Sequence, residues 1–349
     1  MNINSISTLS FNSRLRESTL QKQVELNNAQ YEVASGKKYD LGRQLGTFTS
    51  SVVSLQSKIS LIDQTKVTNS FAENRLQTMQ ISIGSIVESS NNFVGQITTE
   101  LTSDLDQSVL KSIGEATLSS LSSALNVSIK GERVFSGVNT DAVALVDYNG
   151  PDGASAKAAV QLAFQTEFGF AINDPLAETI TPAALENFIQ GAYQSLFDDA
   201  NWESLWSGSS ERGVKAKIST SELVETPTTA HSQSFREVTA AAILIVEFSE
   251  AAFSSATKDQ LANSAISKMA ESTSQLGNEQ AKIGVLEERI EKANERLDFQ
   301  SGVLQSQLSE ITDVDAYEAA LRLNQLSSSL EASYSVTARI QSLSLLNFI

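Results

Sequence analysis

The side chains that most enzymes use for catalysis are scarce in this sequence of 349 residues. It contains one histidine, His231, and no cysteine. A catalytic triad needs a base held by convergent partners, and most zinc sites need several His or Cys ligands. His231 follows Pro227 in a polar stretch, so we interpret it as a solvated loop residue. The sequence therefore predicts a protein that is not an enzyme.

Two carboxylate patterns resemble functional sites only in part. Asp313 and Asp315 begin like a calcium loop, but Glu318 stands where such a loop requires glycine. We therefore interpret the two aspartates as helix-capping residues. Glu287 and Glu288 belong to the charged face of an expected helix, where we expect both carboxylates to be hydrated. We predict no metal, no cofactor and no catalytic residue.

The two tryptophans, Trp202 and Trp206, are four residues apart in an acidic part of the chain. Tryptophans at helical spacing usually pack in a core. The alternative is that both rings stack on a sugar. A glycan-binding role therefore stays open as one interpretation of this segment.

Charge and hydropathy limit the classes of partner. The chain has 25 basic and 41 acidic side chains, a net charge of -16, which opposes binding to nucleic acid and to anionic lipid. The longest apolar run, Ala240 to Val246, is far shorter than the roughly 20 residues of a membrane-spanning helix. The first residues lack the basic start and apolar run of a cleaved signal peptide. We expect neither nucleic acid nor membrane as a partner.

The elements that position these residues are predicted to be mainly helical. All four prolines fall within residues 141–235, so the flanks are free to form long helices. Apolar residues recur there every three or four positions, as in an amphipathic helix. They are Val52, Leu55, Ile59, Ile62, Leu76, Met79, Ile83, Ile86, Phe93 and Ile97 on one flank, and Ile283, Leu286, Ile290, Ala293, Leu297, Leu304, Leu308 and Ile311 on the other.

An apolar stripe must be buried against a partner, and the other flank is the economical one. We predict a mainly α fold, in which both chain ends form a long antiparallel helical bundle or coiled coil around an inserted α+β domain. The predicted divisions are 1–40 with 312–349 as a terminal assembly domain, 41–140 with 236–311 as a bundle domain, and 141–235 as an inserted outer domain.

The inserted segment differs in composition from the flanks. It has 13 acidic and 4 basic side chains and several turn sequences. We predict strands at Ala142–Val146 and at Val214–Ile218, and a helix at Pro182–Phe197 with its proline in the first turn.

Both ends of the chain carry apolar residues on a serine-rich background, whereas chain ends are usually polar. We expect this apolar surface to be covered only on assembly. The predicted assembly interface comprises Ile3, Ile6, Leu9, Leu20, Val24, Tyr31, Leu323, Leu326, Leu330, Ile340, Leu343, Leu346 and Phe348.

Four segments together resemble the flagellin family: Ala34–Lys38, Gly131–Gly137, Ile311–Asp315 and Ala338–Ile349. Each also has a local interpretation. We expect the first helix to end at Ser35-Gly36, because glycine tolerates a left-handed C-cap. We expect Thr312 with Asp315 to start a new helix.

The resemblance implies an extracellular, structural subunit of the bacterial flagellum, exported through the flagellar type III pathway without a cleaved signal peptide. Details at Phe135-Ser136-Gly137 and at the C-terminus favour a subunit that joins hook to filament by helical self-assembly. The implied partners are copies of the chain in a ring or tube, a neighbouring hook-associated protein, flagellin, and an export chaperone on the C-terminal helix. The alternatives are a filament subunit, or a secreted glycan-binding or adhesive module on a helical stalk.

Overall fold

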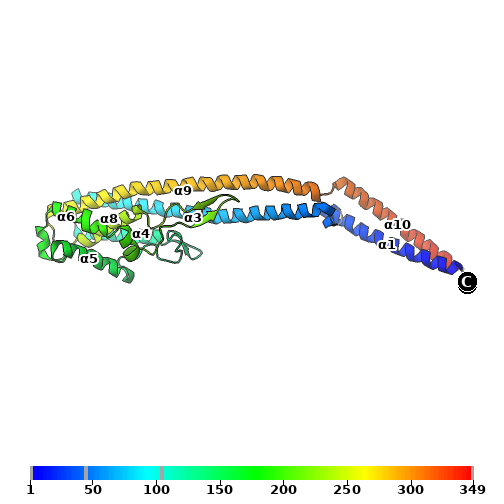
Figure 1. Cartoon of the computed structure of the whole chain (residues 1–349), viewed down its shortest axis with the longest axis horizontal. Helices are drawn as coiled ribbons and strands as arrows, with labels where there is room; N and C mark the ends of the chain where they lie inside the picture. The colour runs from blue at the N-terminus through cyan, green and yellow to red at the C-terminus, as the bar shows by residue number, and fades with distance from the viewer. Residues whose placement is uncertain (1–2, 43–45, 103–105, 347–349) are drawn as a thin grey trace. The chain divides into compact units, whose positions relative to one another are not determined.

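A computed structural model describes residues 3–42, 46–102 and 106–346 (Figure 1). Four long helices dominate it: α1 (Ile3–Ser35), α3 (Thr49–Thr102), α9 (Ser255–Thr312) and α10 (Ala316–Leu346). The chain forms two compact units. Unit 1 is Met1–Asp63 with Asp298–Ile349, and unit 2 is Gln64–Leu297. The predicted pairing of the two chain ends in a mainly helical fold is confirmed.

The remaining elements are shorter. The helices are α4 (Gln107–Leu125), α5 (Ala154–Phe168), α6 (Pro182–Phe188), α7 (Asp199–Asn201) and α8 (Gln233–Phe248). Single turns are η1 (Gly46–Phe48), η2 (Pro151–Gly153), η3 (Pro175–Thr179), η4 (Ile189–Tyr193) and η5 (Trp202–Trp206). Two antiparallel hairpins pair β1 (Ser128–Ile129) with β2 (Glu132–Arg133) and β3 (Lys215–Lys217) with β4 (Leu223–Glu225).

In unit 1, α1 and α10 lie side by side (Figure 1). Helix α1 ends at the predicted Ser35, and Gly36 takes a φ of 70° while its amide donates to Glu32 O. The predicted break in the C-terminal flank is also present, but Asp315 is the capping residue of α10, whereas Thr312 is the last residue of α9. The capping box that the sequence suggests is therefore a single aspartate cap.

The periodic positions of α3 and α9 form a continuous buried seam in unit 2. Every predicted position from Leu76 to Ile97 and from Ile283 to Leu297 is buried. The amide of Gln80 on α3 donates to Gln280 O on α9 at 2.9 Å, and Asn69 donates to Asn294 Oδ1 at 2.6 Å. These polar contacts join the two helices at defined levels, which favours one register over others.

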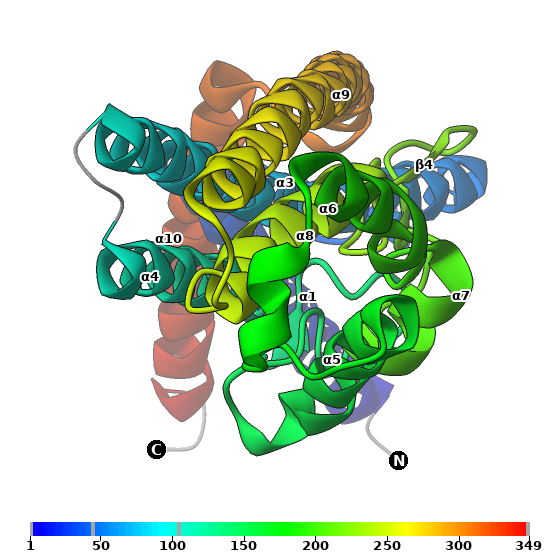
Figure 2. The ribbon, with the colours of Figure 1, turned by 90° about the vertical axis from the view of Figure 1, so that its left-hand side faces the viewer.

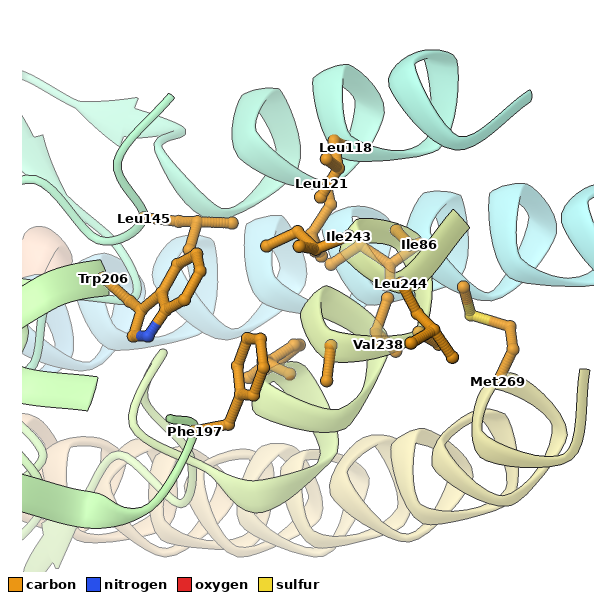
Figure 3. Packing of buried hydrophobic residues seen from close by; sticks show 14 of the residues in the cluster. Ile86, Leu118, Leu121, Leu145, Phe197, Trp206, Val238, Ile243, Leu244 and Met269 are labelled. Carbon is orange, nitrogen blue, oxygen red and sulfur yellow. The ribbon is translucent and has the colours of Figure 1, made fainter. Parts of the chain in front are cut away.

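Helix α8 lies at the centre of unit 2, among α4, α6 and α9 (Figure 2). All residues of the apolar run Ala240 to Val246 are buried. A helix that is apolar all round needs cover on every side. Figure 3 shows this cover, in which Leu118 and Leu121 of α4, Ile86 of α3 and Met269 of α9 surround Ile243 and Leu244.

The segment 141–235 matches the predictions in part. Strand β3 lies within Val214–Ile218, and α6 begins at Pro182 with Thr181 as its cap and continues into the turn η4. The predicted strand at Ala142–Val146 is wrong. Its backbone groups bond to irregular partners, since Val146 N donates to Trp206 O and Gly208 N donates to Val143 O.

Residues of segment 141–235 share one core with α4 and α8. Trp206, Phe197 and Leu145 are buried in the same cluster as Ile243 (Figure 3). The predicted division of the chain into three domains stays a prediction.

No helix in the described part of the chain combines the length and the apolar character needed to cross a lipid bilayer.

We predict that Gly137→Ala destabilises unit 2 by about 3 kcal/mol. Gly137 has a φ of 62°, and a Cβ atom there would lie 2.4 Å from Arg212 O and 2.6 Å from Ser210 O. Gly169→Ala is the matched control, because its φ is 82° but nothing lies within 4 Å of the added Cβ. We expect that control to cost about 1 kcal/mol, from backbone strain alone.

Urea unfolding, followed by tryptophan fluorescence, measures the free energy of unfolding of unit 2 in both variants, since both tryptophans belong to unit 2. Equal losses for the two variants would contradict the close packing at Gly137.

Candidate assembly interface

One face of α1 packs against one face of α10. On α1 the less exposed positions recur at intervals of four and three, and Ala29 is 2% exposed. They are Leu15, Thr19, Lys22, Leu26 and Ala29. On α10 they include Ala319, Leu323, Leu326 and Leu330. The Lys22 ammonium crosses this seam and donates to Ser329 Oγ at 2.7 Å and to Ser333 Oγ at 3.3 Å.

The other faces of the same two helices carry exposed apolar side chains. Val24 is 58% exposed, although a buried position on the same helix lies only five residues away at Ala29. The exposed set on both helices is Phe11, Leu20, Val24, Tyr31, Val33, Tyr317, Leu321, Tyr334 and Val336. Exposed apolar side chains in this number on two paired helices indicate a binding surface.

The predicted interface residues fall into three groups. Leu20, Val24 and Tyr31 are each more than half exposed, and the Tyr31 ring also contacts Tyr39 edge to face. Leu323, Leu326 and Ile340 are half-buried and Leu330 is buried, so the pairing with α1 already uses part of their surface. For Ile3, Ile6, Leu9, Leu343 and Leu346 the structure describes only a helical backbone, and Phe348 lies outside the described residues.

Sequence reasoning missed several exposed residues of this surface, among them Phe11, Tyr317 and Tyr334. Phe11 and Tyr334 continue the spacing of the buried stripes, four residues before Leu15 and four after Leu330, so their spacing gave no signal. Tyr317 is out of register with Ala319 and Leu323, and an apolar residue at such a position was the available signal, because a solvent-facing position does not require one.

The ends of α1 and α9 meet at a compact turn that we call the elbow, residues 32–40 and 311–322. Two backbone hydrogen bonds of 2.9 Å close it, from Lys38 N to Thr312 O and from Val314 N to Gly36 O. The Lys38 ammonium donates to Ile311 O at 2.7 Å, near the negative end of α9. The elbow therefore holds the C-terminal ends of α1 and α9 at one level of unit 1.

A buried carboxylate supports the elbow. The Glu32 side chain is 5% exposed, its Oε1 accepts from Tyr39 N at 3.2 Å, and its Oε2 lies 3.8 Å from Arg322 Nη1. A pocket of about 270 Å³ opens beside it, lined by Glu32, Lys38, Asp313, Val314, Asp315, Glu318, Ala319 and Arg322. A wider groove of about 540 Å³ lies between Ser50–Lys58 of α3 and Gln307–Ile311 of α9.

The residues singled out for possible chemistry take structural roles. His231 is not a solvated residue, since its side chain is 12% exposed and its Nε2 lies 3.5 Å from Asp199 Oδ1. Asp199 also binds Arg236 at 2.6 Å, so the histidine belongs to a structural polar cluster with these two residues. Trp202 and Trp206 are fully buried and stacked on each other. The core interpretation is confirmed, and stacking of these rings on a sugar is excluded.

Carboxylates of the flanks behave similarly. Asp315 Oδ1 accepts from Tyr317 N at 2.8 Å and from Glu318 N at 3.0 Å, which confirms its capping role. Glu287 is half-buried and therefore less hydrated than expected. Burial raises the pKa of its carboxyl group, a hydrogen bond with Gln80 lowers it, and the Glu73 charge adds to the rise. Within the described ranges, no three His, Asp or Glu side chains are grouped to hold a metal ion.

Comparisons with known proteins fit this arrangement. Residues 6–140 match the model of the bacterial flagellin N-terminal helical region, and residues 251–349 match that of the bacterial flagellin C-terminal helical region. A search of curated protein sequences gave no significant match.

The fold is similar to a solved structure from Vibrio parahaemolyticus, described as a candidate flagellar hook-associated protein. The two share 12% sequence identity with a TM-score of 0.52, over 77% of this chain and 99% of the other. Both terminal regions carry the family's helices, and these helices form the apolar surface described above. The chain therefore belongs to the flagellin family, a family of non-enzymatic structural proteins of the bacterial flagellum.

Proposed function

We propose that this chain joins the hook to the filament by helical self-assembly, in the manner of the hook-filament junction subunit called flagellar hook-associated protein 3. Its terminal helices pack against those of neighbouring copies in a ring or tube. Heterologous contacts, in which two different surfaces meet, generate such assemblies.

The observation that carries the assembly role is the one-sided packing of α1 and α10. Each helix buries a single seam against the other and leaves residues such as Leu20, Val24 and Tyr31 exposed. Exposed apolar area costs free energy of about 25 cal/mol per Å², which neighbouring copies can recover on assembly.

Two observations favour a junction subunit over a filament subunit. Phe135-Ser136-Gly137 resembles the turn of junction proteins, and here it is closely packed, with Phe135 fully buried and Gly137 next to Arg212 O. The fold likeness to a structure described as a candidate hook-associated protein points the same way.

The proposal brings further partners. A hook-associated protein would contact one side of the ring and flagellin the other, and an export chaperone would cover α10 before export. The apolar residues Tyr317, Leu321, Tyr334 and Val336 of α10 are exposed and suit such a cover.

A filament subunit remains the alternative, because the two flagellin models match regions that both kinds of subunit share. The glycan-binding alternative has lost its main support, since both tryptophans lie in the core of unit 2.

Electron microscopy of a strain that lacks the gene tests the junction role, together with an assay for flagellin in the medium. We expect bare hooks and unpolymerised flagellin shed into the medium, because the filament has no base on which to grow. Missing filaments without shed flagellin would contradict the junction role and favour the filament subunit.

We predict that Val24→Ser abolishes incorporation into flagella while the α1–α10 pair of the monomer stays intact, because Val24 faces solvent there. Leu330→Ser is the matched control, since Leu330 is 8% exposed and faces the seam. We expect Leu330→Ser to destabilise the pair by about 2 kcal/mol.

Amide exchange of α1 and α10 in each monomer separates the two effects. Exchange that accelerates equally in both variants would contradict an intermolecular role for Val24.

A further inference from the structure

Two of the six tyrosines of the chain, Tyr39 and Tyr317, stand at the elbow, and Tyr31 directly precedes it; all three are exposed. Tyr31 and Tyr39 are each about half exposed and contact each other edge to face, with ring centroids 5.5 Å apart. Tyr317 is 80% exposed at the start of α10. Exposed tyrosines of this kind are enriched at protein interfaces, where arginine is the other favoured residue.

The elbow is also acidic. Its pocket is lined by four carboxylates (Glu32, Asp313, Asp315 and Glu318) and two cations (Lys38 and Arg322), a net charge of -2. Both cations already have contacts within the chain, Lys38 with Ile311 O and Arg322 with Glu32. Asp313 and Glu318 are exposed at the rim. The elbow therefore combines aromatic rings with carboxylates, which suits a guanidinium group.

The first part of α1 has the complementary character. Residues 10–22 carry three basic side chains and one acidic, a net charge of +2. Arg14 is exposed one helical turn after the exposed ring of Phe11, whereas Arg16 is exposed on the other side of the helix. An exposed apolar ring next to an exposed arginine provides both the anchor and the charge that the elbow lacks.

The two surfaces of one copy cannot meet. Arg14 and Tyr31 belong to the continuous helix α1, and their separation of 17 positions spans about 26 Å at 1.5 Å per residue. An arginine side chain does not bridge that distance. Any contact between these surfaces must therefore join two copies.

We propose that the elbow of one copy binds residues 10–22 of α1 of a second copy. Arg14 pairs with Asp313 and Glu318 and packs against the tyrosine rings. This inference rests on the proposed function, because it identifies which surfaces the assembling copies use. The contact joins two different patches, as a repeating heterologous interface requires.

Photo-crosslinking in assembled flagella tests the contact. Tyr317 is replaced by p-benzoylphenylalanine in the full chain. The flagella are assembled from a mixture of isotopically light and heavy subunits, so that links between copies are recognised. We expect the probe to link to residues 10–22 of another copy. The same probe at Val285, which is 60% exposed in unit 2, is the control, and we expect no link to residues 10–22.

A probe at Tyr317 that links only to other segments of assembled copies would overturn this contact and leave the proposed function standing. A chain that is absent from flagella even without any substitution would overturn both.

Charge exchange provides a second test if the probe itself disturbs assembly. We expect R14E and E318R each to lower incorporation into flagella roughly fivefold, and the two changes together to restore it. The capping residue Asp315 and the buried Glu32 stay unchanged, so the elbow keeps its internal contacts. A double variant that is incorporated less than either single variant would contradict the contact.

Discussion

A pair of helices can bury only one seam of each helix, and the organisation of unit 1 follows from this limit. Helices α1 and α10 pack against each other and bury Ala29 of α1 and Leu330 of α10 in their shared seam. Lys22 bridges this seam to two serines of α10. Every apolar residue outside the seam then stays in solvent unless another chain covers it. For a family of subunits that build the flagellum, we propose that the uncovered residues are the means of assembly.

Unit 2 solves the same problem within one chain. Its long helices α3 and α9 also share a seam, but α4, α8 and the segment 141–235 pack around them. The apolar run Ala240 to Val246 is buried on all sides. Unit 2 and unit 1 thus differ in how many elements cover each helix, so that apolar residues are buried on all sides in one and on one side in the other.

Periodicity and capping made much of this fold predictable. The seam from Leu76 to Ile97 and the end of α1 at Ser35 follow from local rules, since helical spacing and a left-handed glycine need no distant partner. Ala142–Val146 and His231 were misjudged because their structure depends on residues far along the chain, Trp206 and Asp199. The exposed faces at Leu20, Val24 and Tyr31 were predicted from their apolar character, whereas Tyr317 at the elbow depends on tertiary placement.

The most direct test uses the absence of cysteine from the chain. Val24→Cys introduces one thiol on the exposed face of α1, and its reaction with a maleimide is compared in the monomer, in assembled flagella and in denatured protein. We expect rapid labelling of the monomer and strong protection in flagella, because a neighbouring copy covers the residue. Equal labelling of the thiol in monomer and flagella would contradict the claim that this face is buried by assembly.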